Sequence, residues 1–375
     1  MPYATSASDG SAVPTNIYTI GLLLISTSVI TYVASIRIIK IDTQHTSMKS
    51  RLNSEQMESV LYNCIIDKAP CKLGNNLDEI RDLNGRTLLH WVVNLSLKEE
   101  TEYLLSLGVN PNEKDDEGQT PLHYAAAGEN VDIVMMLLNR GADVNARDNK
   151  GRIPLHYAKK QEVAELLIKY GSNVNATDYQ GNVPLHTVGP DVIEILLKYG
   201  ANPNIKNNSG LPPIYYQLQR SCKAAVKLLY ATSEDVVGIK DEYGNTLLHV
   251  ATGHGCKEAI RWLARHIDVN SRNRDGNTPL HIATFERDTE IIRLLINLGA
   301  NVNAPNNNGM TPLQFIAAMC RKEFNCSDIL EVIPVNELNI DIILKHAFNV
   351  EQLKLLRLLY NRGIMPSLLS ILSQI

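Results

Sequence analysis

Apolar residues recur at helical spacing through most of this chain of 375 residues. Val131, Val134, Leu137 and Leu138 fall on one face of a helix, because residues three and four apart lie above one another. Gly141 follows the run, and glycine is typical of the residue just past a helix C-terminus. The pattern predicts amphipathic helices, and the same closing glycine occurs at Gly108, Gly171, Gly200 and Gly299.

A shorter helix is predicted ahead of each of these. Asp115 to Gly118 supplies the residue types of a tight turn. The hydroxyl of Thr120 can then accept from a free amide of the first helical turn, and Pro121 fits the first helical position, where its missing N–H costs nothing. The same Thr-Pro pair occurs at Thr278 and Thr311.

The glycine of this turn, here called the anchor glycine, recurs every 29 to 34 residues. One such helix pair cannot bury its own apolar face, so the pairs must stack on one another. The sequence therefore predicts an all-α repeat solenoid of stacked helix-turn-helix repeats with projecting hairpin loops. The anchors are Gly85, Gly118, Gly151, Gly181, Gly210, Gly244, Gly276 and Gly309.

These motifs resemble the ankyrin repeat. Residues 118–127 read GQTPLHYAAA and residues 133–146 read IVMMLLNRGADVNA. The resemblance implies two antiparallel helices per repeat, hairpin loops at right angles to them, and a curved solenoid whose concave face binds other proteins. We expect a polar N-terminal tail at 1–16, a linker and capping helix at 37–81, the repeat array at 82–333, and a divergent repeat and C-terminal cap at 334–375.

Residues 17–36 form an uncharged, largely apolar run of twenty residues. At about 1.5 Å per residue a helix of this length spans roughly 30 Å, the thickness of a bilayer core. Arg37 and Lys40 follow it, and positive charge marks the cytoplasmic side. We expect a single-pass membrane protein with cytoplasmic repeats. A buried capping helix, a cleaved segment or a start at Met48 remain alternatives.

Two repeats are short, and one is irregular. The steps from Gly151 to Gly181 and from Gly181 to Gly210 are 30 and 29 residues, and the loss falls where the first helix joins the second. We predict that each first helix lacks a turn, which leaves a notch in the concave face. In the Gly210 repeat, Pro212 and Pro213 replace Thr-Pro, which suggests a joint between two blocks of repeats.

Composition and motif content argue against several classes of function. A formal net charge of −4 without a basic stripe argues against nucleic-acid binding. The six cysteines show no metal-binding spacing, no disulfide framework and no regular placement in the repeat, so we expect them to be reduced. No phosphate loop, metalloprotease motif or nucleophile elbow is present, so we expect no enzyme activity, no cofactor, no metal and no small-molecule substrate.

A histidine follows most anchor glycines by five residues. Stacked helices lie about 8 to 10 Å apart, too far for equivalent histidines to share a zinc ion at about 2 Å. The resemblance implies that this histidine is a structural hydrogen-bonding residue. The set is His90, His123, His156, His186, His249 and His281.

Protein binding is expected to use residues that the fold does not need. These stand beside the anchor glycines and on the open face of the first helices, and aromatic and arginine side chains are enriched in interface hot spots. The leading hypothesis is a membrane-tethered scaffold for a protein partner. The alternative is a soluble effector exported to act on host-cell proteins. The candidate binding residues are Lys150, Arg152, Tyr179, Tyr243, Arg274 and Phe285.

Overall fold

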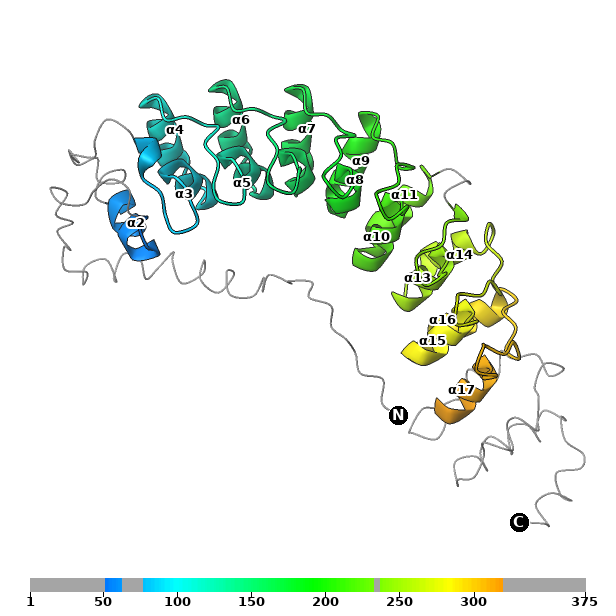
Figure 1. The fold of residues 1–375 in the computed structure, drawn as a ribbon. Coiled ribbons are helices and arrows are strands. Elements are labelled where there is room, and N and C mark those ends of the chain that lie inside the picture. Colours follow the sequence, from blue (N-terminus) through cyan, green and yellow to red (C-terminus); the bar gives the residue numbers. More distant parts are fainter. Residues whose placement is uncertain (1–50, 63–76, 233–236, 320–375) are drawn as a thin grey trace, which may run out of the picture. The chain divides into compact units, whose positions relative to one another are not determined.

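The computed structural model describes residues 51–62, 77–232 and 237–319, all within one compact unit that begins at Arg51 (Figure 1). These residues form helices and turns, with isolated β-bridges and no strands. The expected membrane segment at 17–36 and the expected terminal cap at 334–375 lie outside them. None of the described helices has the length and apolar character needed to cross a bilayer.

Each of the first seven repeats contributes an inner helix, which follows the anchor glycine, and an outer helix after it; of the eighth repeat, the described residues include the inner helix. The inner helices are α3 (Leu88–Asn94), α5 (Pro121–Ala127), η4 (Pro154–Tyr157), α8 (Pro184–Thr187), α10 (Pro213–Arg220), α13 (Leu247–Gly253), α15 (Pro279–Glu286) and α17 (Pro312–Met319). The outer helices are α4 (Lys98–Ser106), α6 (Val131–Asn139), α7 (Gln161–Lys169), α9 (Pro190–Lys198), α11 (Cys222–Leu229), α14 (Lys257–Leu263) and α16 (Thr289–Asn297). This arrangement confirms the all-α repeat solenoid.

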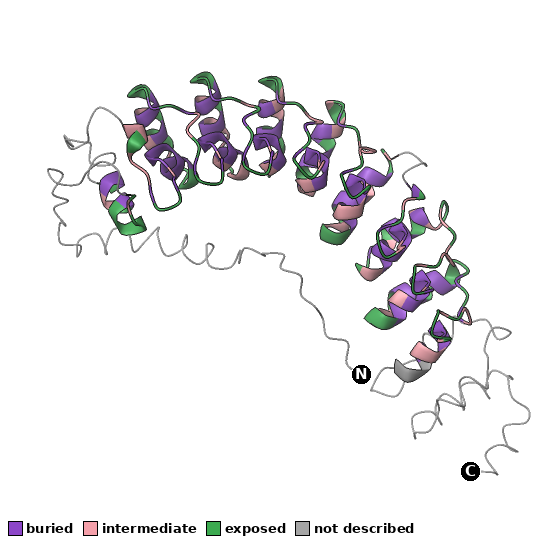
Figure 2. Cartoon of the chain, viewed as in Figure 1, coloured by how far each residue is buried: buried purple, intermediate pink, exposed green. Residues whose placement is uncertain are grey.

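The core lies between neighbouring helix pairs (Figure 2). Leu122 and Leu137, from the two helices of one repeat, are completely buried, as are Leu155 and Leu167 from the next. Inner helices pack on inner helices and outer on outer along the chain. Because each pair contacts only its neighbours, stability is distributed along the array instead of residing in one central core.

The helix starts follow the predicted chemistry in part. The inner helices α5, α15 and α17 begin at the expected prolines. At Thr311 the hydroxyl accepts from the amide of Gln314 at 3.3 Å, as predicted. At Thr120 the prediction is wrong, because the hydroxyl lies 3.0 Å from Nδ1 of His123. The hydrogen-bond partner of the Thr120 hydroxyl is therefore the histidine ring and not a free backbone amide.

The two short repeats have short inner helices, as predicted. Both η4 and α8 span four residues. A shortened helix leaves backbone carbonyls without a hydrogen-bond donor from the next helical turn. Side chains from the following repeat donate to these carbonyls instead. Thr187 donates to the carbonyl of His156 at 2.8 Å, and the buried amide of Gln217 donates to the carbonyls of Leu185 and Val188 at 3.0 and 2.9 Å.

A helix at the expected N-terminal cap precedes the first repeat. It is α2 (Ser54–Val60), and its N-cap is Asn53, whose side chain accepts from the amide of Gln56. The amide of Leu52 donates to the carbonyl of Arg81 at 2.9 Å, which ties this segment to the short 3-10 helix η3 (Leu77–Glu79) and the first hairpin.

Candidate functional site

Each hairpin is shaped by the residue three positions before its anchor glycine. In the second repeat, Oδ1 of Asp115 accepts from the amides of Glu117 and Gln119 at 2.9 and 2.8 Å. Asp115 is thereby consumed in building the turn. The hairpin ends, defined here as the two residues before each anchor glycine, are left to face outward.

The hairpins are numbered in chain order from the one at Gly85. Two candidate binding residues are neighbours at the third and fourth hairpins, which contain Gly151 and Gly181. The amide of Tyr179 donates to the carbonyl of Lys150 at 2.9 Å, so the two residues are neighbours across adjacent hairpins. The Tyr179 ring lies against Gly151, where a Cβ would meet it at 2.7 Å, yet the side chain is 67% exposed. Lys150 is exposed as well. One aromatic face and one cation are therefore presented together.

A second pair forms at the sixth and seventh hairpins. The amide of Arg274 donates to the carbonyl of Tyr243 at 2.9 Å. Tyr243 is 64% exposed, and Arg274 is exposed with its stem against Gly244. Four of the six sequence-predicted residues thus form two aromatic–cation pairs, with the fifth hairpin between them.

Arg152 is held within its own repeat. Its guanidinium bonds to the buried carboxylate of Asp148 at 3.0 Å and lies 4.5 Å from the centre of the Tyr157 ring. Only part of the side chain is left to meet a partner. Its role in binding stays a prediction.

Phe285 lies near the C-terminal end of α15 and is 75% exposed. It is not joined to the hairpin pairs by any contact described for it. Aromatic side chains are enriched in interface hot spots, so Phe285 stays a predicted binding residue.

Tyr230 was missed by the sequence reasoning. It is the C-cap of α11 and is 77% exposed. At the same place in the two preceding repeats, Tyr170 and Tyr199 reach back to Asn139 and Glu165 of the repeat before. The available signal was the absence of a closing glycine after this helix.

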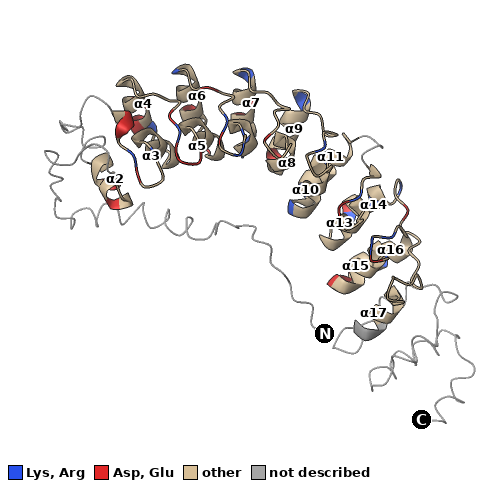
Figure 3. Cartoon of the chain, viewed as in Figure 1, with Lys and Arg blue, Asp and Glu red and all other residues tan. Residues whose placement is uncertain are grey.

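Four acidic residues cluster at the second hairpin, Glu113, Asp115, Asp116 and Glu117, and two of them are paired with arginines of this chain. Asp116 pairs with Arg51 through both carboxylate oxygens, and Glu113 pairs with Arg81 at 2.5 Å. Elsewhere in the described chain, positive and negative side chains are interspersed (Figure 3). Charge alone therefore does not mark one partner class.

The six repeat histidines bridge neighbouring repeats, as the resemblance implied. Nδ1 of His90 accepts from the amide of Thr87 at 3.1 Å, and Nε2 donates to the carbonyl of Gln119 at 3.0 Å. A carbonyl can only accept, so the proton is assigned to Nε2 and the ring is neutral. Burial lowers the pKa of His90 to about 4. The same bridges join His123, His156, His186, His249 and His281 to the carbonyls of Arg152, Asn182, Leu211, Asn277 and Met310.

Both ring nitrogens of these histidines have partners, so they do not form a metal site. No group of three or more potential metal-ligating side chains occurs among the residues that the structure describes.

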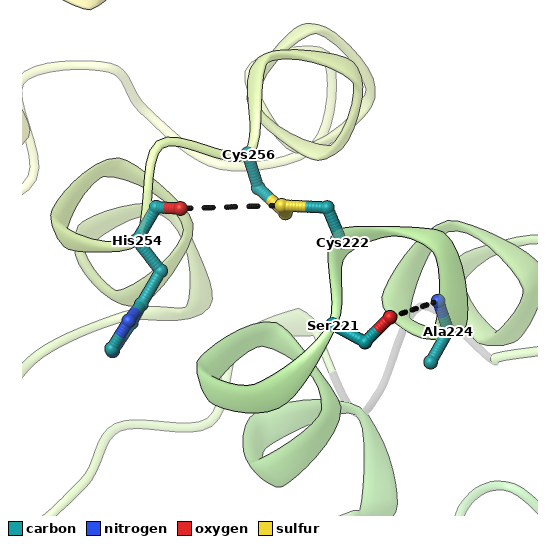
Figure 4. Close-up of a disulfide and its surroundings, with 5 residues drawn as sticks. All are labelled: Ser221, Cys222, Ala224, His254 and Cys256. Atoms are coloured by element: carbon teal, nitrogen blue, oxygen red, sulfur yellow. Dashed lines mark hydrogen bonds between the residues drawn. A yellow bond between two sulfur atoms is a disulfide. The ribbon is translucent and has the colours of Figure 1, made fainter. Parts of the chain in front are cut away.

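The expectation of reduced, irregularly placed cysteines is wrong for one pair. Cys222 and Cys256 form a disulfide, with Cα atoms 5.4 Å apart (Figure 4). They are 34 residues apart, one repeat step, and each follows its anchor glycine by twelve residues. Both cysteines lie where an outer helix begins. Aligning cysteines on the anchors would have revealed the pair. The other four cysteines lie outside the described residues.

Comparison with known proteins agrees with the repeat pattern. A family model described as ankyrin repeats, in three copies, matches residues 56–148, 89–178, 186–273 and 265–346, which together cover most of the chain. No curated protein matches it.

Proposed function

Because the chain belongs to the ankyrin repeat family, we propose that it is a non-enzymatic scaffold that binds a protein partner through its hairpin ends and the open face of its inner helices. The observation that carries this proposal is the exposure of Tyr179, Tyr243 and Phe285 at 64% or more, although the fold does not require them to be aromatic. Aromatic side chains supply large contact areas with few rotatable bonds, which suits an interface.

The placement of Lys150 and Arg274 beside two of these aromatics favours a partner segment that offers both apolar and acidic groups. An apolar side chain of the partner would cover a ring while a carboxylate pairs with the adjacent cation. Interface hot spots are enriched in tyrosine and arginine, the residue types of the pair formed by Tyr243 and Arg274.

The test compares partner capture by the full-length chain with capture by the triple variant Tyr179→Ala, Tyr243→Ala and Phe285→Ala. We expect the Kd for the captured partner to rise at least about tenfold, since one hot-spot residue is worth about 2 kcal/mol or more. Tyr170→Ala is the matched control, because Tyr170 is also exposed but ends an outer helix. Equal binding by the triple variant with unchanged circular dichroism would reject this surface.

We further propose that residues 17–36 tether the scaffold to a membrane, with the repeats on the cytoplasmic side. Support comes from the uncharged run and from the positive charge that follows it at Arg37, Lys40, Lys49 and Arg51. Membrane association should resist carbonate extraction and disappear when 17–36 are deleted. A mature chain that begins near Met48 would instead favour the exported effector.

A further inference from the structure

Adjacent hairpins are joined by a ladder of backbone hydrogen bonds. In each rung, the amide two residues before one anchor glycine donates to the carbonyl one residue before the preceding anchor. Such bonds, 2.9 to 3.0 Å long, run from Asp116 to Asn84, Asn149 to Glu117, Tyr179 to Lys150, Asn208 to Gln180, Arg274 to Tyr243, and Asn307 to Asp275.

The ladder has one interruption, between the fifth and sixth hairpins. The corresponding rung would join the amide of Glu242 to the carbonyl of Ser209, and no backbone hydrogen bond links 206–211 to 240–245. A Cβ added to Gly210 would meet nothing within 4 Å, whereas one added to Gly181 or Gly244 would meet the next hairpin at 2.5 or 2.9 Å. The two hairpins are therefore apart.

The histidine bridge changes at the same junction. The fifth repeat has Tyr215 where six of the other seven repeats have a histidine, and its hydroxyl donates to the carboxylate of Asp241 at 2.8 Å. This is the one hydrogen bond from the fifth repeat to the 240–245 hairpin within the described residues. The helices still stack across the junction, since α10 packs on α13 and α11 on α14.

The disulfide crosses this same junction on the helical side. Cys222 begins α11 in the fifth repeat, and Cys256 is the N-cap of α14 in the sixth. No other disulfide occurs among the described residues. The covalent bond thus lies where the hairpin ladder is interrupted.

We propose that the junction between the fifth and sixth repeats is a redox-controlled hinge, which the Cys222–Cys256 disulfide holds closed and reduction releases. In the oxidised form, the bond fixes the outer helices of the two repeats to each other. In the dithiol form, the two repeats are held together by helix packing, by the bond from Tyr215 to Asp241 and by the contact of the Cys222 thiol with the carbonyl of His254. After reduction, the fifth and sixth repeats separate from each other before any other neighbouring repeats do.

The chemistry is thiol–disulfide exchange with a small-molecule thiol. Cys222 is half-buried, whereas Cys256 is buried, so the attacking thiolate reaches Sγ of Cys222. The S–S bond breaks and Sγ of Cys256 leaves as a thiolate. A second small-molecule thiolate then attacks the sulfur of the first, and Sγ of Cys222 leaves as a thiolate. Two electrons and two protons pass to the cysteine pair, and the small molecule becomes a disulfide. The carbonyl of His254, 4.0 Å from Sγ of Cys222, is placed to accept from the new thiol.

The test measures hydrogen–deuterium exchange of the full-length chain in mild detergent, after equilibration with oxidised glutathione or with dithiothreitol. Cys64, Cys71, Cys320 and Cys326 are replaced by serine so that only this pair can respond. We expect reduction to raise amide exchange in peptides covering 206–211 and 240–245 at least tenfold. Peptides covering the second and third hairpins, 115–119 and 148–152, should not change.

Two further measurements secure the result. Peptide mapping without reductant should recover Cys222 and Cys256 in one linked species after the glutathione treatment. The variant Cys222→Ser with Cys256→Ser should exchange rapidly at the junction under both conditions. The hinge is rejected if both cysteines are recovered as free thiols after oxidation, or if reduction leaves exchange at the junction unchanged. The reduction arm uses the chain that retains Cys222 and Cys256, so it does not depend on the folding of the Cys222→Ser, Cys256→Ser variant.

Discussion

The histidine bridge shows how one residue links two repeats. His123 accepts from the amide of Thr120 within its own repeat and donates to the carbonyl of Arg152 in the next, at 3.0 and 3.1 Å. We expect His123→Ala to lower the free energy of unfolding by about 1–3 kcal/mol, because two buried polar groups lose their partner. Urea unfolding followed by circular dichroism would measure the loss.

Glutamine is the matched replacement for His123. Gln314 occupies the equivalent position in the last described repeat, where its Oε1 accepts from the amide of Thr311 at 2.8 Å. His123→Gln should therefore retain the bond inside the repeat and lose less stability than His123→Ala. Equal losses in the two variants would contradict this account of the bridge.

The histidines also set a pH dependence. Burial lowers the pKa of each of the six in the folded state, to about 4 for His90. Below about pH 6.5 the unfolded chain therefore binds protons that the folded chain does not. Their stabilisation is complete above that pH and is lost as the pH falls toward 4, at up to about 1.4 kcal/mol per pH unit for His90.

The urea concentration at the unfolding midpoint should accordingly decrease as the pH is lowered from 6.5 to 4.5. Ordinary carboxylates titrate near pH 4, so most of this window belongs to histidine. Replacing His90 with glutamine should flatten the profile, and a midpoint constant from pH 7 to pH 5 would contradict the prediction.

Among the structural elements, the hairpins differ in how closely they approach one another. Gly181 and Gly210 have similar positive φ angles, 78° and 74°, so alanine at either site takes on a left-handed strain of about 1–2 kcal/mol. Only at Gly181 would the new Cβ also meet the next hairpin, at Asn208. We expect Gly181→Ala to destabilise the chain more than Gly210→Ala, by about 1 kcal/mol for the disrupted rung. Equal destabilisation in thermal unfolding would show that the fifth and sixth hairpins are also in contact.

The sequence predicted these elements well at positions where a residue type is favoured by one local backbone conformation. Prolines at helix starts, glycines past helix ends and the two shortened inner helices are as predicted, because each follows from local backbone geometry. The cap at Thr120 was not, since a neighbouring histidine competes for the hydroxyl. The pairing of Lys150 with Tyr179, and the missing rung at Ser209, depend on how one hairpin lies against the next. Local pattern carries no information about that distance.

Across the whole array, stability should depend on position. The two tryptophans, Trp91 in the first repeat and Trp262 in the sixth, lie on either side of the interrupted junction. Leu122 is completely buried in the second repeat, and Leu→Ala at such a site costs about 2–5 kcal/mol. With the disulfide reduced, Leu122→Ala should lower the unfolding midpoint reported by Trp91 more than the midpoint reported by Trp262.

Single-tryptophan variants, Trp262→Phe and Trp91→Phe, would separate the two fluorescence signals. In the oxidised chain we expect the two midpoints to move closer together. Identical shifts at both tryptophans in the reduced chain would mean that the array unfolds as one unit.

The capping of the short inner helices limits how this chain can have evolved. Thr187, in the repeat anchored at Gly181, donates to a carbonyl of the Gly151 repeat. Gln217, in the repeat anchored at Gly210, donates to two carbonyls of the Gly181 repeat. A repeat protein lengthens by duplicating units, and most units here could be duplicated or deleted singly. The three repeats anchored at Gly151, Gly181 and Gly210 cannot be rearranged individually without leaving buried carbonyls unpaired. A recombination event that separated them would leave these carbonyls without their present partners.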